Sequence, residues 1–284
     1  MGAHRYTLLD VFTATPLAGN ALAVVHGADQ LEEPEMLAFA RETRLSETTF
    51  VQSSFVAGAD YRNRIWTVER ELPFAGHPSL GTAVAVAYVA GVQGSARYVQ
   101  ETVAGLQPID VQLDGQHATA SMLQEPAVHG PELERSRTLT AIGLTPEHAD
   151  PRLPSQVVAA GAATLIVPLR DREALARARP DYDAIAALIG PNRALTLYAA
   201  VCEPETGRAY ARSFVSAATG EDPATGSAAG PLCAYLAART GCASIAIDQG
   251  MEMGRPSRLD AAMEGDRPRV GGDVVVVIDG TVHL

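Results

Sequence analysis

The chain of 284 residues contains no lysine, because all 22 of its basic residues are arginine. Without lysine a protein cannot form an internal aldimine with pyridoxal phosphate or carry out Schiff-base catalysis through a lysine side chain. It also lacks the lysine of a Walker A phosphate-binding loop. Several common enzyme classes are therefore excluded at the outset.

Cysteine is scarce and unpatterned. The three cysteines, Cys202, Cys233 and Cys242, show no C-x-x-C spacing and are odd in number, as expected for isolated thiols in a reducing compartment. The seven histidines form neither H-E-x-x-H nor H-x-H, so we expect no metal site. No G-x-G-x-x-G follows a predicted strand, so nothing supports a nicotinamide or flavin, and we expect no cofactor.

An excess of positive charge and a long apolar run are also missing. The formal net charge is -11, which disfavours nucleic acid and anionic membranes as partners and leaves a small molecule as the expected one. No uninterrupted apolar window reaches the roughly 18 residues of a transmembrane helix. Residues 1–10 lack the apolar segment of a signal peptide, so the expected location is the cytoplasm.

What is present is a compact mixture of short apolar strands and a few helices, with hydrophobic residues making up 47% of the chain. β-rich runs predict strands at 6–12, 21–25, 48–51, 62–68, 111–113, 118–122, 157–160, 164–167, 195–201, 210–215, 274–278 and 281–284, the last two joined by a turn at Asp279-Gly280. Periodicity and end signals predict helices at 33–41, 78–90, 172–178, 183–189 and 227–238.

Two of these helices are apolar on nearly every side and begin in similar sequences. ELPFAGHP (residues 71–78) precedes one and EDPATGSA (residues 221–228) begins the other, with Gly76 and Gly226 separated by about half the chain. Since short strands surround both, we predict an internally duplicated α+β protein of two domains. Each domain would wrap a curved sheet or barrel around one central helix. We place the domains at residues 1–115, joined by a last strand at 280–284, and 116–279.

The two helix starts are also candidate binding sites. A helix N-terminus offers unpaired N–H groups and a positive dipole end, which suit a carboxylate or an oxyanion. His77 lies at the first start and Asp222 at the second, where each could transfer a proton or polarise a substrate. For a single helix start, ordinary capping by Asp222, Thr225 or Ser227 is the favoured explanation. The presence of two matched starts favours function.

Five short motifs, in order along the chain, resemble one family. They are DVFT with Pro16 and Gly19-Asn20, LSETTF (45–50), ELPFAGHP, EDPATGSAAG (221–230) and Gln249-Gly250 followed by GRPS (254–257). As a set they are similar to the PhzF-like isomerases of phenazine biosynthesis, which are related in fold to diaminopimelate epimerase. The resemblance implies two epimerase-like domains with the active site between them, commonly in a homodimer, and isomerisation by a proton shuttle without a cofactor.

The resemblance also implies roles for individual residues. Glu47, within LSETTF, matches the acid–base residue, and His77 and Asp222 match its assisting residues. Gly76, Gly226 and Ser227 match the positions that hold the substrate, and Ser46 and Asn20, inside matching motifs, are assigned to substrate binding as well. In the epimerase branch two cysteine thiols at the helix starts act as acid and base. Neither start has a cysteine here, which disfavours two-thiol racemisation.

The chain departs from the family pattern at Ala21, at WTV (66–68) and at Ser216, positions that bear on the substrate more than on the chemistry. The expected function is a double-bond shift on a small carboxylate-bearing substrate in specialised-metabolite biosynthesis. The best-known family reaction isomerises trans-2,3-dihydro-3-hydroxyanthranilate. Three alternatives stay open: an isomerase of another natural-product pathway, an epimerase, and a non-catalytic small-molecule binder on the same scaffold.

Overall fold

The computed structural model describes residues 2–284 and divides into two compact units. The first comprises the described residues up to Met122 together with Gly271–Leu284, and the second comprises Leu123–Val270. The chain therefore passes from one unit to the other within strands β8 (His117–Leu123) and β17 (Arg267–His283). The first unit extends beyond the predicted limit at residue 115 and includes more of the C-terminal segment than residues 280–284.

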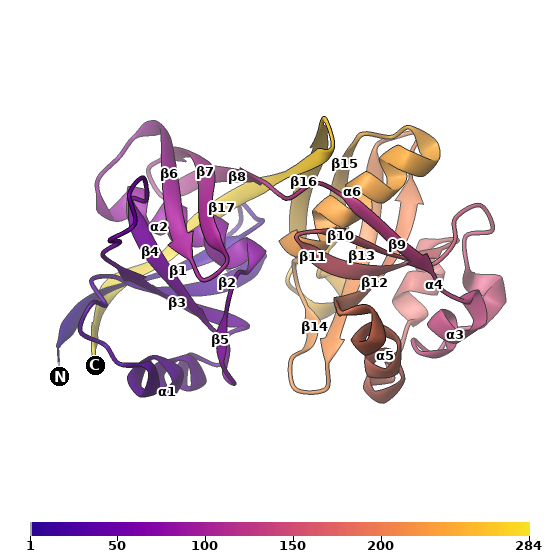
Figure 1. Cartoon of the computed structure of the whole chain (residues 1–284), viewed down its shortest axis with the longest axis horizontal. Helices are drawn as coiled ribbons and strands as arrows, with labels where there is room; N and C mark the ends of the chain where they lie inside the picture. Colours follow the sequence, from indigo (N-terminus) through magenta and orange to yellow (C-terminus); the bar gives the residue numbers. More distant parts are fainter. Residues whose placement is uncertain (1) are drawn as a thin grey trace. The chain divides into compact units, whose positions relative to one another are not determined.

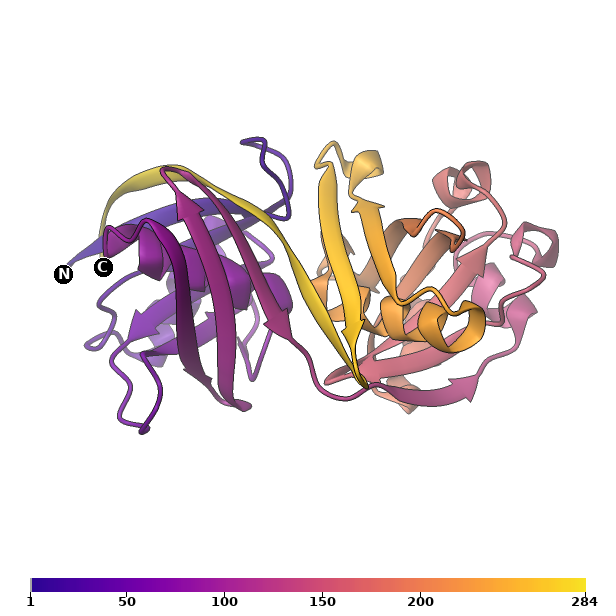
Figure 2. The same ribbon diagram turned by 90° about the horizontal axis from the view of Figure 1, so that it is seen from above.

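In the first unit, strands close into a barrel. Its members are β1 (Ala3–Val11), β2 (Asn20–Val25), β3 (Glu47–Gln52), β4 (Tyr61–Trp66), β6 (Gly94–Thr102), β7 (Gly105–Asp114), β8 and the C-terminal part of β17. Each strand pairs with the next in this order, β17 pairs with β1, and β5 (Glu71–Leu72) adds to β4. Figures 1 and 2 show this sheet curving around helix α2 (Gly76–Val89).

Helix α2 is buried on nearly all sides because its sequence, GHPSLGTAVAVAYV, carries no charged side chain. An apolar helix inside a barrel removes from water the inward-facing apolar side chains of every surrounding strand. A second helix, α1 (Glu33–Thr43), packs on the outside through Met36 and Ala40 against Phe50 and Trp66. It ends at Arg44 in the left-handed conformation (φ 54°), from which the chain turns directly into β3 at Glu47.

The second unit repeats this plan. Its strands are β9 (Val128–Glu132), β10 (Gln156–Ala160), β11 (Ala162–Leu169), β12 (Ala194–Glu203), β13 (Arg208–Ser216), β14 (Gly220–Asp222), β15 (Ser244–Gln249), β16 (Ser257–Glu264) and the first residues of β17. Its helices are α3 (Arg135–Thr140), α4 (Arg172–Arg177), α5 (Tyr182–Ile189) and the central α6 (Gly226–Thr240), with 3₁₀ turns at Pro146–His148, Gly190–Asn192 and Met251–Met253.

Strand pairing confirms the predicted duplication. β1–β2 and β10–β11 are antiparallel, β2–β3 and β11–β12 are parallel, and β3–β4 and β12–β13 are antiparallel. Likewise β4–β6 and β13–β15 are both parallel, and the central helix of each unit follows the short strand β5 or β14. Residues 124–127 hydrogen-bond along the start of β17, as in Gln124 N–H to Pro268 O at 2.9 Å. Both units are thus curved sheets around one central helix.

One sequence prediction is wrong. Asp279-Gly280 was expected to form a turn, yet β17 runs unbroken from Arg267 to His283 and pairs Asp279 with Thr7 and Gly280 with Tyr6 of β1. Arg5 on β1 donates to both carboxylate oxygens of Asp279, at 3.0 and 2.6 Å. The paired neighbour strand and this cross-strand ion pair override the local turn preference of Asp-Gly.

Helices in residues 2–284 are all too short or too polar to span a lipid bilayer.

The closure of the first barrel generates a test. A Cβ on Gly271 would lie 2.6 Å from the backbone oxygen of Ala120 and 2.7 Å from Cβ of Ser121, so β17 can approach β8 only without a side chain there. Gly271→Ala should therefore lower the free energy of unfolding by about 1–3 kcal/mol in urea titrations. Gly280→Ala, in the same strand with nothing within 4 Å, is the control and should change it by less than about 1 kcal/mol. Equal effects at the two positions would contradict the tight approach.

Candidate active site

The first helix start is fixed by a buried chain of hydrogen bonds. Asn63 Nδ2 donates to Gln100 Oε1 (2.9 Å), and Gln100 Nε2 donates to Oγ of Ser79 (2.7 Å). Ser79 in turn donates to the carbonyl of Ala75, the residue before α2 (2.7 Å). Since side-chain amides of strands β4 and β6 thus reach the Ser79 hydroxyl in the first turn of α2, that turn is held against the barrel wall.

The same helix is tied to the strand that carries Glu47. Thr49 on β3 and Thr82 on α2 are hydrogen-bonded through their hydroxyls at 2.8 Å in the buried interior. Thr48, on the other face of β3, bonds the hydroxyl of Thr43 near the end of α1 at 2.8 Å. Glu47 is the first residue of β3 and pairs with Leu22 of the parallel strand β2. The carboxylate is therefore carried by a strand end that is anchored on both faces.

Glu47, His77 and Asn20 come together at this place. His77 Nε2 lies 3.3 Å from Oε2 of Glu47, and the other ring nitrogen, Nδ1, lies 3.2 Å from Nδ2 of Asn20. The His77 and Glu47 side chains are 6% and 17% exposed. With the Asn20 amide donating to Nδ1, the ring hydrogen is on Nε2, which lies beside the carboxylate but is not aligned for a hydrogen bond to Oε2.

Burial lowers the pKa of His77 to about 3 from an ordinary value of 6.5. The ring is therefore neutral at physiological pH, so an uncharged imidazole, not an imidazolium, lies beside Glu47. The family resemblance led us to expect His77 near Glu47; its neutral state follows only from the surrounding structure.

The second helix start has a different arrangement in its own unit. Thr225 Oγ1 donates to Oδ2 of Asp222 at 2.5 Å. Gln249 Nε2 donates to the Asp222 carbonyl (2.7 Å) and to Thr225 Oγ1 (3.1 Å), while its Oε1 accepts from Thr225 N (3.2 Å) and from the Tyr198 hydroxyl (2.8 Å). Asp222 is half-buried. The bond from Thr225 orients this carboxylate, and it is not a cap, because the N-cap residue Thr225 makes no side-chain cap hydrogen bond.

The remaining predicted residues lie at these two starts. Ser46 is half-buried next to Glu47, and Gly76 is the buried first residue of α2. Gly226 is the buried first residue of α6, and its carbonyl accepts from Gln124 Nε2 at 2.9 Å. Ser227 follows it and is half-buried. The residues expected from the sequence therefore lie at the two helix starts. The sequence did not reveal the residues whose hydrogen bonds orient these starts, which are Gln100 and Ser79 in one unit and Gln249, Tyr198 and Gln124 in the other.

Cysteines are placed where they cannot act as the acid and base. Cys233 lies in the middle of α6 and Cys202 on β12, and burial raises the pKa of each thiol to about 12. Neither is at a helix start. Over residues 2–284, no three or more His, Cys, Asp or Glu side chains gather in a way that could hold a metal ion.

The buried neutral His77 predicts a pH dependence of stability. Its pKa is about 3 in the folded protein and about 6.5 when unfolded, so as the pH falls the unfolded chain binds the proton first. The free energy of unfolding should fall below pH 6.5 and continue to fall to about pH 3. Between pH 7 and 4.5 this contribution is about 2 kcal/mol.

Urea unfolding of the His77→Asn variant measures this contribution, because the variant should lose that part of the pH dependence. His117→Asn, at an exposed position, is the control and should keep the wild-type dependence. If His77→Asn and the wild type respond alike to pH, the ring is not buried in the neutral state.

Comparison with known proteins shows which family the chain belongs to. The family model described as phenazine biosynthesis-like protein matches residues 9–280. A trans-2,3-dihydro-3-hydroxyanthranilate isomerase of Pseudomonas aeruginosa is 37% identical over 99% of this chain and 100% of its own length.

Two solved structures agree with this match. A predicted epimerase from Pseudomonas aeruginosa has a TM-score of 0.86 at 32% identity, covering 98% of this chain and 99% of its own. A PhzF-family phenazine biosynthesis protein from Bacillus anthracis has a TM-score of 0.88 at 26% identity, covering both chains fully. The chain therefore belongs to the phenazine biosynthesis-like family, has the predicted epimerase-like fold and is an isomerase.

Proposed function

We propose that this isomerase moves a proton between two carbons of a small, carboxylate-bearing substrate and shifts a double bond, without a cofactor. The observation that carries the proposal is the Glu47 carboxylate held 3.3 Å from a buried, neutral His77. A carboxylate in a largely dry place can accept a proton from an activated C–H group and return it to another carbon. Such a reaction gains and loses no atoms, so one acid–base group is sufficient.

In this proposal Glu47 is the catalytic residue and His77 assists it. The neutral ring lies 3.3 Å from Oε2 and limits the directions in which the carboxylate can point toward the substrate. When Glu47 takes up the proton, the adjacent ring hinders rotation of the carboxyl group before it gives the proton back. Because the pKa of His77 is about 3, the ring does not take up the transferred proton at physiological pH, and the proton stays with Glu47.

Substrate binding is assigned to the two helix starts and their neighbours. The first backbone N–H groups of α2 and α6, at Gly76 and Gly226, have no partner within their helices and suit a carboxylate or an enolate oxygen. Ser227 adds a hydroxyl, and Ser46 and Asn20 flank Glu47. Asp222, oriented by Thr225, is the second assisting acid.

The substrate class rests on the relative named trans-2,3-dihydro-3-hydroxyanthranilate isomerase. At 37% identity the reaction type is transferred more readily than the exact substrate, so an isomerase of another specialised-metabolite pathway is included in the proposal. An epimerase is a second candidate because one similar structure carries that description. Assembly as a homodimer stays a prediction of the family resemblance, and a cytoplasmic location stays a prediction of the sequence.

Turnover in deuterated water tests the proposal with trans-2,3-dihydro-3-hydroxyanthranilate as the first substrate. Deuterium at the carbon that gains the proton, with the double bond moved, is expected for the wild type. Deuterium with inversion at one carbon identifies an epimerase, and binding without any exchange identifies a binder.

The role of Glu47 has its own test. Glu47→Gln should reduce turnover at least a thousandfold, because an amide cannot accept the proton, while ligand affinity stays within about tenfold. Glu42→Gln, exposed on α1, is the matched control and should retain wild-type rates. Turnover by Glu47→Gln at more than a tenth of the wild-type rate would remove Glu47 from the catalytic role.

A further inference from the structure

A buried arginine occupies the same topological place in both units. Arg64 lies on β4 and Arg212 on β13, the two strands that correspond in the duplication, and their side chains are 10% and 8% exposed. Each donates through Nε and Nη2 to both oxygens of one glutamate on the following short strand, Glu71 on β5 and Glu221 on β14. Each arginine also lies over the aromatic ring two residues later, with 5.7 Å to the Trp66 centroid and 5.0 Å to that of Phe214.

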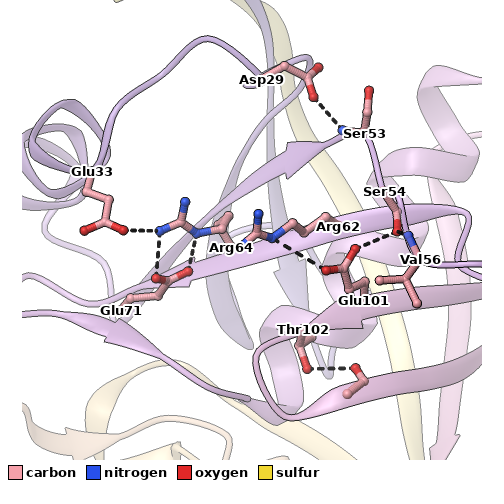
Figure 3. Close-up of polar contacts among 11 residues, drawn as sticks. Asp29, Glu33, Ser53, Ser54, Val56, Arg62, Arg64, Glu71, Glu101 and Thr102 are labelled. Atoms are coloured by element: carbon pink, nitrogen blue, oxygen red, sulfur yellow. Dashed lines mark hydrogen bonds and ion pairs between the residues drawn. The ribbon is translucent and has the colours of Figure 1, made fainter.

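Both arginines reach outward to a helix that covers the barrel. Arg64 Nη2 donates to Glu33, the first residue of α1, at 3.1 Å, and Figure 3 shows the arginine between Glu33 and Glu71. Arg212 Nη1 donates to the carbonyls of Leu175 and Ala178 at the end of α4, at 3.1 and 3.0 Å. Each pair therefore joins an outer helix to the strand that leads into the central helix.

The first pair also lies between the two elements that carry the proton-transfer residues. Trp66 is opposite Thr48, the residue after Glu47, and it is opposite Glu71 on its other side. From Glu71 the chain runs through residues 72–75 directly into α2 and His77. A displacement of Glu71 would be passed along this short segment to the His77 ring.

Stability alone is a poor reason to bury such a pair. Removing two charges from water is costly, and apolar residues of similar volume are often as stable or more so. A planar guanidinium that donates two parallel hydrogen bonds to one carboxylate instead fixes the relative orientation of the two side chains. The repetition of the same fork at both helix starts argues that geometry is its purpose.

We propose that Arg64 and Glu71 are a positioning pair that sets the distance between Glu47 and His77, and that Arg212 and Glu221 orient the neighbouring Asp222 in the same way. This inference rests on the proposed function of Glu47 and His77. Neither arginine takes part in the reaction itself.

Steady-state kinetics of Arg64→Lys provides the first test. Lysine keeps the charge but cannot form the fork, so kcat should fall roughly 10- to 100-fold, the loss typical of a displaced catalytic group, with KM changed less than threefold. Arg62→Lys is the matched control, since Arg62 is on the same strand, is 41% exposed and lies 3.9 Å from Glu101. The control should keep the wild-type kcat. An unchanged kcat in Arg64→Lys would overturn the proposal.

A double variant separates positioning from stability. Arg64→Met with Glu71→Leu replaces the charges by apolar side chains, so the thermal midpoint should return to within a few degrees of the wild-type value while kcat stays low. If kcat recovers together with the thermal midpoint, the pair serves stability only and the proposal fails.

The ¹⁵N shifts of the His77 ring give a readout that needs no substrate. Arg64→Lys should shift the Nε2 resonance, whereas Arg62→Lys should leave it in place. Identical His77 resonances in wild type and Arg64→Lys would refute positioning even if every variant were inactive. If instead the wild type turned over no substrate, the proposed function would fail while the NMR comparison would still decide this inference.

Discussion

The contact between the buried His77 ring and the Glu47 carboxylate is the interaction on which the account of this protein depends. Three elements must begin at one place for it to exist: β2 at Asn20, β3 at Glu47 and α2 at Gly76. The parallel pairing of β2 with β3 aligns the first two starts, and the Thr49–Thr82 hydrogen bond fixes α2 against β3. Because α2 fills the barrel, the ring that it carries is out of water and stays neutral. The burial of the His77 ring and its neutral state thus both follow from the position of α2 inside the barrel.

The duplication repeats the same backbone arrangement in both units, with different side chains at the start of each central helix. In each unit a short strand leads into a buried helix, and a buried arginine–glutamate fork holds that strand. The first unit places a histidine at the second position of the helix, next to a carboxylate from β3. The second places Ser227 there, with Asp222 bonded to Thr225 instead. The first helix start therefore carries an imidazole beside a carboxylate, and the second carries a hydroxyl and an aspartate. The two units differ here in a few side chains, while the pairing order of the strands is the same.

Local sequence predicted the two central helices and both helix starts, because an all-apolar helix after a Gly-containing turn is a strong local signal. It also indicated the duplication, and the family resemblance gave Glu47 as the expected acid–base residue. Strands β6, β9, β15 and β16 escaped prediction because each mixes a few β-branched or aromatic residues with Gly, Pro, Ala or charged residues, so no β-rich run is visible. The Asp279-Gly280 turn failed for the opposite reason, since a clear local signal was overridden by pairing with β1. The contacts of Gln100, Gln249 and Arg64 depend on residues brought together only by barrel closure, and no local pattern contains them.

The central claim is that His77 is a buried neutral ring with its single ring hydrogen on Nε2, the nitrogen that lies 3.3 Å from Oε2 of Glu47. Long-range ¹H–¹⁵N NMR of the histidine rings, recorded from pH 7 down to pH 4.5, measures this directly. The account predicts a neutral His77 with the hydrogen on Nε2 across the whole range, because its pKa is about 3. An imidazolium appearing near pH 6.5, or a neutral ring with its hydrogen on Nδ1, would contradict it.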